Sequence, residues 1–116
     1  MNKYQGSCHC GRIAYEVKAE ITEVTQCNCS HCGRKGYLLT FVPRQQVKLT
    51  TSESNLSTYS FNKHRIAHHF CNVCGCAPIA FGKDSKGNEV ASINVRCLPD
   101  FDVSRVKIND FNGRSL

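Results

Sequence analysis

Residues 27–32 read Cys-Asn-Cys-Ser-His-Cys and place three thiols and one imidazole within six positions. Three thiolates this close together would repel one another in water, and a divalent metal with an affinity for sulfur removes that repulsion. Zinc is the usual metal of this kind, and it prefers four ligands. Because the stretch supplies three cysteines and no obvious fourth ligand, it is typical of a catalytic zinc with one open position.

The chain has nine cysteines in 116 residues, and two further pairs accompany the first group. Cys8 and Cys10 are separated by one residue, and Cys71 and Cys74 by two. The odd total and the tight spacings favour metal binding over disulfides, because cysteines one residue apart rarely meet the geometry that a disulfide requires.

Two arrangements of these groups around metals are conceivable. Joining the last two cysteines of residues 27–32 to the pair at 71 and 74 would give a zinc ribbon. However, 38 residues separate Cys32 from Cys71, against roughly 15–20 in the usual ribbon spacing. Joining the pair at 8 and 10 to the pair at 71 and 74 gives a closed four-thiolate site and leaves residues 27–32 as a separate site. We predict this second arrangement because it uses all seven clustered cysteines.

Cys76 and Cys97 remain outside both predicted sites. A free cysteine often behaves as a small buried hydrophobic residue, and we expect that role for both. A role for either as the fourth ligand of the three-cysteine group is the alternative.

The composition indicates a globular chain, with 41% hydrophobic and 21% charged residues. A length of 116 residues suits one domain over residues 1–116. The sequence has no apolar run near ~18 residues that would span a membrane, and residues 1–6 lack an apolar signal region. We therefore expect no membrane partner and a cytoplasmic location, where thiols stay reduced.

The formal net charge of +6 indicates an anionic partner, unless it only solvates the surface. The lysines and arginines are scattered and form no long basic run. This distribution favours a small carboxylate-bearing ligand over nucleic acid.

Short stretches with alternating apolar and polar residues, separated by turn residues, predict an all-β fold. The predicted strands comprise a hairpin over residues 3–18 and strands at 24–26, 37–42, 47–50, 56–61, 66–70, 77–81, 90–95 and 106–108. Residues 33–36 are predicted to form a loop, and residues 98–102 to start a single helical turn.

The cysteine groups within residues 6–11, 27–36 and 70–75, followed by Asn-Val-Arg-Cys-Leu at 94–98, occur here in a specific order. In this the chain resembles the glutathione-dependent formaldehyde-activating enzyme family, also called the Gfa or centromere-protein-V family. The likeness covers about Tyr4 to Leu98. It implies a β-tent fold, in which two antiparallel sheets in a single Gfa-like domain are held together by zinc.

The resemblance also implies two zinc ions and a carbon–sulfur lyase activity. The family name implies that glutathione adds to formaldehyde and gives S-hydroxymethylglutathione. Carried over to this sequence, the structural zinc ligands are Cys8, Cys10, Cys71 and Cys74, and the catalytic zinc ligands are Cys27, Cys29 and Cys32.

Other side chains near these motifs are candidates for binding and proton transfer. His31 lies within the three-cysteine stretch and could give a proton to the oxygen of a thiol–aldehyde adduct. Arg34, Lys35 and Arg96 could hold ligand carboxylates, and we favour Arg34 and Arg96 because they stand beside the motifs. His68 and His69 alternate along a predicted strand, so one of them could face the site.

Two other functions are consistent with the sequence. The chain could be a non-catalytic, zinc-stapled module that binds a thiol or an anion. It could also be a basic domain that binds nucleic acid or protein, with an affinity that falls steeply with salt.

Overall fold

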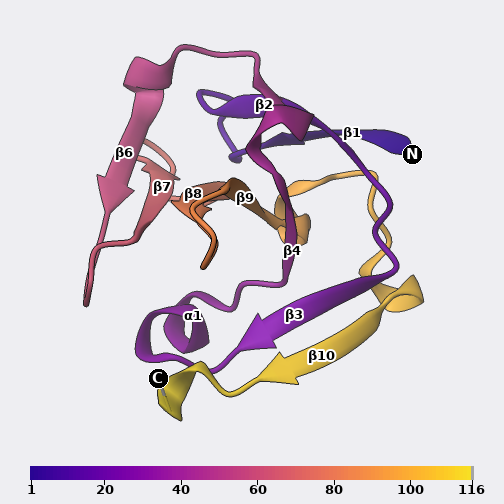
Figure 1. The fold of residues 1–116 in the computed structure, drawn as a ribbon. Helices are drawn as coiled ribbons and strands as arrows, with labels where there is room; N and C mark the ends of the chain where they lie inside the picture. Colours follow the sequence, from indigo (N-terminus) through magenta and orange to yellow (C-terminus); the bar gives the residue numbers. More distant parts are fainter. Residues whose placement is uncertain (116) are drawn as a thin grey trace.

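The computed structural model describes residues 1–115 and places their ten strands in two sheets (Figure 1). The smaller sheet has the strand order β1-β2-β5, and the larger has the order β10-β3-β4-β9-β8-β7-β6. The strands are β1 (Asn2–Ser7), β2 (Ala14–Ala19), β3 (Glu23–Cys27), β4 (Leu39–Pro43), β5 (Val47–Leu49), β6 (Leu56–Tyr59), β7 (Ile66–Cys71), β8 (Ile79–Lys83), β9 (Glu89–Asn94) and β10 (Lys107–Phe111). The predicted all-β fold with two sheets is confirmed.

The hydrophobic core lies between the two sheets. β1 and β2 form the antiparallel hairpin predicted over residues 3–18, and alternate residues of β2 are buried (Tyr15, Val17 and Ala19). These side chains pack against buried residues of the larger sheet, including Val24 of β3 and Ile93 of β9. The period-two alternation thus gives β2 one apolar face, and that face covers the larger sheet.

Strands β6 to β9 form an antiparallel meander in which each strand pairs with the next. β7 ends at Cys71, and the turn to β8 carries Cys74. β8 begins directly after Pro78, two residues later than predicted, because proline has no N–H to donate to a strand ladder. The Tyr15 hydroxyl donates to the Pro78 carbonyl at 3.1 Å and so connects this hairpin to the smaller sheet.

A short helix, α1 (Ser30–Lys35), replaces the loop that was predicted at residues 33–36, so that prediction was wrong. The Cys29 side chain caps its N-terminus by accepting the N–H of Cys32, and Gly36 ends it in a left-handed conformation with a φ of 71°. At six residues α1 falls well short of a bilayer thickness, and residues 1–115 contain no helix that is long and apolar enough to cross a membrane.

The single helical turn predicted at residues 98–102 is present as one hydrogen-bonded turn, in which the Phe101 N–H donates to the Leu98 carbonyl at 3.0 Å. Short 3₁₀ turns lie on either side of that range, at Val95–Cys97 and Val103–Arg105. Each is preceded by a residue, Asn94 or Asp102, whose side chain accepts a backbone N–H of the turn. These local hydrogen bonds hold one 3₁₀ turn just before residues 98–102 and the other just after them.

The last strand, β10, departs from the antiparallel pattern that the family resemblance implied. It runs parallel to β3, with Phe111 opposite Cys27, and it extends beyond the predicted range of 106–108. Figure 1 shows the two strands side by side, with the C-terminal segment ending close to α1. Gly113, which follows β10, is thereby brought against the three-cysteine group.

Candidate metal centres and adjoining cavity

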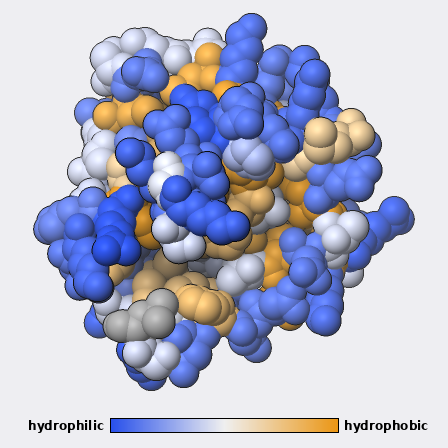
Figure 2. Space-filling view, viewed as in Figure 1, coloured by the Kyte–Doolittle hydropathy of each residue, from blue (hydrophilic) through white to orange (hydrophobic). Residues whose placement is uncertain are grey.

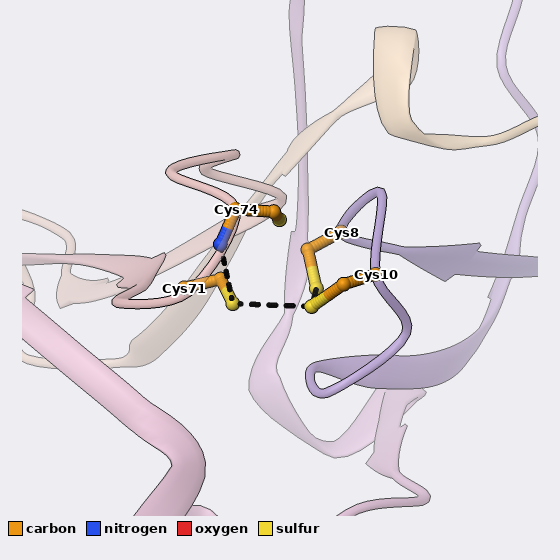
Figure 3. A group of neighbouring side chains, drawn as sticks. All are labelled: Cys8, Cys10, Cys71 and Cys74. Carbon is orange, nitrogen blue, oxygen red and sulfur yellow. Dashed lines mark hydrogen bonds between the residues drawn. The ribbon is translucent and has the colours of Figure 1, made fainter.

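The predicted four-thiol group is assembled from two loops that are far apart in sequence (Figure 3). Cys8 and Cys10 come from the β1–β2 turn, while Cys71 and Cys74 flank the end of β7. The four sulfurs lie within 4.8 Å of one another, with 3.8 Å between Cys8 and Cys10 and 3.5 Å between Cys10 and Cys71. A tetrahedron with Zn–S bonds of about 2.3 Å has edges of roughly 3.8 Å. The spacing therefore fits a tetrahedral zinc.

Backbone N–H groups donate to sulfurs of this group, and such hydrogen bonds lower the pKa of Cys71 and of Cys74. The N–H of Ile13 donates to Cys8 Sγ at 3.3 Å, and the N–H groups of Val73 and Cys74 both donate to Cys71 Sγ at 3.4 Å. Hydrogen bonds from the backbone N–H of Cys76, and then from that of Cys10, lower the pKa of Cys74 to about 5. Such donors orient metal-bound thiolates and stabilise their charge.

The three-thiol group lies at the junction of β3 and α1. Cys27 ends β3, Cys29 caps α1 and Cys32 lies in its first turn, with the three sulfurs within 4.8 Å of one another. The N–H of Cys29 donates to Cys27 Sγ at 3.4 Å, and the N–H of Cys32 to Cys29 Sγ at 3.3 Å. Within residues 1–115, no fourth cysteine, histidine or carboxylate joins this group. It therefore matches the ligand number of a zinc site with an open position.

The thiols of this group differ in their readiness to ionise. Burial acts to raise the pKa of Cys29, but hydrogen bonds from Cys32 and Cys27 outweigh it, and the pKa is lowered. Burial, together with the neighbouring Cys29, raises the pKa of Cys32. Thiols arranged in this way share protons, and a bound metal cation would displace those protons.

A cavity of about 300 Å³ opens beside the three-thiol group. It lies between α1, β3, β4, β8 and the C-terminal segment, and Figure 2 shows hydrophobic surface in a hollow near the middle of this face. Its walls are mainly aromatic and aliphatic side chains: Tyr37, Leu39, Phe41, Phe61, Ile66, Ala77, Ile79, Ala80 and Phe111. The cavity has the size and apolar character of a small-molecule site.

The structure places the other predicted site residues outside the cavity wall. His31 lies on α1 and packs against His68, with their ring centroids 4.4 Å apart, and its buried Nδ1 has no hydrogen-bond partner within residues 1–115. Arg34 donates to the Ser30 carbonyl of its own helix at 2.8 Å. Arg96 donates to the Gly36 carbonyl at 3.2 Å. The proposed proton-transfer and carboxylate-binding roles of these three residues remain predictions.

Of the two neighbouring histidines, His68 lines the cavity. Burial, reinforced by the charge of a nearby His31, lowers the pKa of His68 to about 4, so its imidazole is neutral at pH 7. His69 instead faces a wider groove of about 1210 Å³, where its Nδ1 lies 3.0 Å from Thr58 Oγ1. The predicted alternation along this strand is therefore confirmed, and His68 is the histidine beside the thiols.

Cys76 and Cys97 do not join either metal-binding group among the described residues. The Cys97 sulfur accepts a hydrogen bond from Asn94 Nδ2 at 3.7 Å, and burial raises the pKa of its thiol to about 11. Cys76 packs beside the four-thiol group without entering it. Both residues are thus placed as partly buried thiols.

The sequence reasoning missed three residues of this region, namely Tyr37, Phe111 and Gly113. Tyr37 precedes β4 and contributes a buried wall of the cavity, and its burial raises its pKa to about 12. Phe111 and Gly113 reach the cavity only because β10 pairs with β3. The sequence around Tyr37, and that around Phe111 and Gly113, has no motif that would indicate such a site.

Gly113 packs so tightly on the three-thiol group that a larger residue should disturb it. A Cβ at this position would lie 2.5 Å from Cys27 Sγ and 3.1 Å from Cys29 Cβ. We expect Gly113→Ala to weaken zinc binding at this group by about 10- to 100-fold, as changes beside metal ligands typically do. Zinc titration against a competing chelator measures this change.

Gly33→Ala is the matched control for that substitution, because its Cβ would lie no closer than 3.7 Å to the Asn28 carbonyl oxygen. Its zinc affinity should equal that of the unmodified protein. Equal zinc affinities in Gly113→Ala and Gly33→Ala would show that the packing of Gly113 does not shape the three-thiol group.

Two comparisons with known proteins agree with this architecture. The family model described as "Glutathione-dependent formaldehyde-activating enzyme" matches residues 3–113. A crystal structure of a Rhodobacter sphaeroides protein superposes with a TM-score of 0.77 at 24% sequence identity, covering 90% of this chain and 99% of that one. At 24% sequence identity, the similarity to that structure shows a shared fold.

Proposed function

Because the chain belongs to the glutathione-dependent formaldehyde-activating enzyme family, we propose that it is a zinc-dependent carbon–sulfur lyase. The reaction joins a small thiol to an aldehyde: a bond forms between sulfur and the carbonyl carbon, and the thiol proton ends on the carbonyl oxygen. The reverse reaction breaks that bond and restores both partners. Glutathione and formaldehyde, giving S-hydroxymethylglutathione, are the pair that the family description suggests.

The observation that carries this proposal is the contrast between the two cysteine groups. Four thiols in one group can surround a zinc completely, whereas the three at residues 27–32 leave one position for a ligand and border a cavity. We assign a structural zinc to Cys8, Cys10, Cys71 and Cys74, and a catalytic zinc to Cys27, Cys29 and Cys32. A zinc held by three thiolates lowers the pKa of an incoming thiol and so supplies a thiolate at neutral pH.

The protein's own side chains would orient the reactants and carry the proton. A substrate bound between the apolar walls would displace water from the reacting atoms, which strengthens electrostatic interactions there. His68 lines the cavity in its neutral form and contacts His31. We propose that these two histidines carry the proton between sulfur and the carbonyl oxygen, with His68 as the residue nearer to the substrate.

Exchange NMR on a mixture of glutathione and formaldehyde tests the proposed activity. Thiols add to formaldehyde without an enzyme, so the readout is the increase in the interconversion rate above the uncatalysed rate. We expect the zinc-loaded protein to raise that rate and Cys27→Ser to lose most of the increase, because the two remaining thiols are too few to hold zinc. Cys76→Ser is the matched control, since its sulfur lies outside both groups. Thiol binding without any rate increase would identify a binding module and contradict the enzymatic proposal.

A further inference from the structure

We infer that the cavity beside the three-thiol group selects a thiol with an apolar body, such as an aryl or branched alkyl group, over the charged tripeptide glutathione. This inference rests on the proposed function, because it places the thiol sulfur at Cys27, Cys29 and Cys32. It goes further by assigning the chemical class of the group attached to that sulfur.

The cavity wall has no charged side chain to pair with a charged ligand. Among its lining residues the polar side chains other than cysteine and tyrosine are Thr25, Asn62, His68, Ser92 and Asn94. Asn94 is already occupied, because its amide donates to the Ala77 carbonyl at 3.2 Å and accepts the N–H of Arg96 at 3.2 Å. His68 is neutral at pH 7. The wall therefore offers little compensation for a buried charge.

Glutathione carries two carboxylates and one ammonium group at the two ends of the tripeptide. Burying such charges without partners is costly. Arg34 and Arg96, two of the candidates for holding carboxylates, do not line the cavity, and both guanidinium groups donate to backbone carbonyls. Lys35 lines the smaller adjoining pocket beside His31 and His68 and lies outside this wall. The cavity wall itself thus lacks the ion-pairing groups that recognition of a buried glutathione would use.

Exposed hydrophobic side chains are concentrated at this cavity. Phe41 is 54% exposed, Ile66 44% and Phe111 48%, and they come from β4, β7 and β10 respectively. Three strands that are not adjacent in the sheet thus direct large apolar side chains at one space. A hydrophobic ligand would remove this surface from water, which is a favourable contribution to binding.

The dimensions of the cavity agree with a ligand of this kind. Its volume of about 300 Å³ lies at the lower end of the ~300–1,000 Å³ range of small-molecule sites. The one carbon that formaldehyde adds to a thiolate is too small to occupy this apolar space, most of which would then hold water. A ring-sized group attached to the sulfur would occupy roughly half of it, since a cavity of about 150 Å³ holds benzene.

Calorimetric titration of the zinc-loaded protein with three thiols tests the inference. The probes are benzyl mercaptan, 2-mercaptoethanol and glutathione, with benzyl alcohol as the ligand that keeps the apolar body and lacks the thiol. We expect benzyl mercaptan to bind at least tenfold more tightly than glutathione and than benzyl alcohol. Equal or tighter binding of glutathione would overturn the inference.

Phe111→Ala and Ile108→Ala form a matched pair of variants for the same titration. Both residues are exposed on β10, at 48% and 44%, but only Phe111 lines the cavity. We expect Phe111→Ala to weaken binding of benzyl mercaptan about tenfold and to leave 2-mercaptoethanol unchanged, while Ile108→Ala changes neither. Equal effects of the two substitutions would overturn the assignment of the apolar wall.

The same titration separates the inference from the function on which it rests. If 2-mercaptoethanol and glutathione bind and benzyl mercaptan gains nothing, the proposed thiol site stands and the apolar selectivity is wrong. If no thiol binds to protein with zinc at both groups, the proposed function itself fails. If benzyl mercaptan fails to bind because a second copy of the chain covers the cavity, sedimentation shows a dimer and the inference is also wrong.

Discussion

Cys71→Ser should leave the protein unfolded or insoluble. The Cys71 sulfur lies 3.5 Å from that of Cys10, 61 residues earlier in the chain, so a metal in this group fastens the β1–β2 hairpin to the β7–β8 hairpin. A structural zinc can contribute on the order of 10 kcal/mol to folding. Small domains are stable by about 5–15 kcal/mol in total. Loss of this metal therefore removes most of the free energy of unfolding.

Circular dichroism melting and zinc analysis of the soluble fraction measure this effect. Cys76→Ser is the control, because it alters a thiol in the same turn that lies outside the four-thiol group. It should keep two zinc ions per chain and a melting temperature near that of the unmodified protein. A Cys71→Ser protein with unchanged melting and full zinc content would exclude a structural metal at this group.

The grouping of the cysteines was predictable because it depends on residue type and short spacing. Thiols separated by one, two or three residues can reach one metal whatever the surrounding fold. A pair of cysteines supplies only two of the four ligands of a zinc, so the other two must come from another group. Pairing Cys8 and Cys10 with Cys71 and Cys74 left no clustered thiol without a group, and the structure brings these four together. The alternation that predicted the strands is a similarly local signal.

Helix α1 and the cavity could not be predicted in the same way. A helix of six residues has almost no intrinsic stability, and this one depends on a cap from the Cys29 sulfur, which propensities do not describe. The cavity is built by side chains from several strands, among them Phe41 of β4 and Phe111 of β10. Its shape depends on the parallel pairing of β10 with β3, a long-range contact without a local sequence signal.

Cys29→Ser should remove one of two zinc ions while the fold remains intact. Two thiols remain at residues 27–32, too few for a stable zinc site, whereas the four-thiol group is untouched. Helix α1 should survive, because serine is among the preferred N-cap residues and can accept the N–H of Cys32 in place of the sulfur. We therefore expect zinc to fall from two to one per chain with a much smaller drop in melting temperature than in Cys71→Ser.

Zinc content with and without glutathione, for the unmodified protein, Cys29→Ser and Ser30→Ala, is the decisive measurement. Ser30 is the neighbouring residue, is exposed and contributes no metal ligand, so its variant should match the unmodified protein. Glutathione should change the exchange of only one zinc in the unmodified protein and of none in Cys29→Ser, because only an open position accepts a thiol. One zinc in all three proteins would contradict the pairing of the cysteine groups. Two zinc ions in Cys29→Ser would show that the Cys29 sulfur is not a ligand, and the proposed catalytic centre would then have to be abandoned.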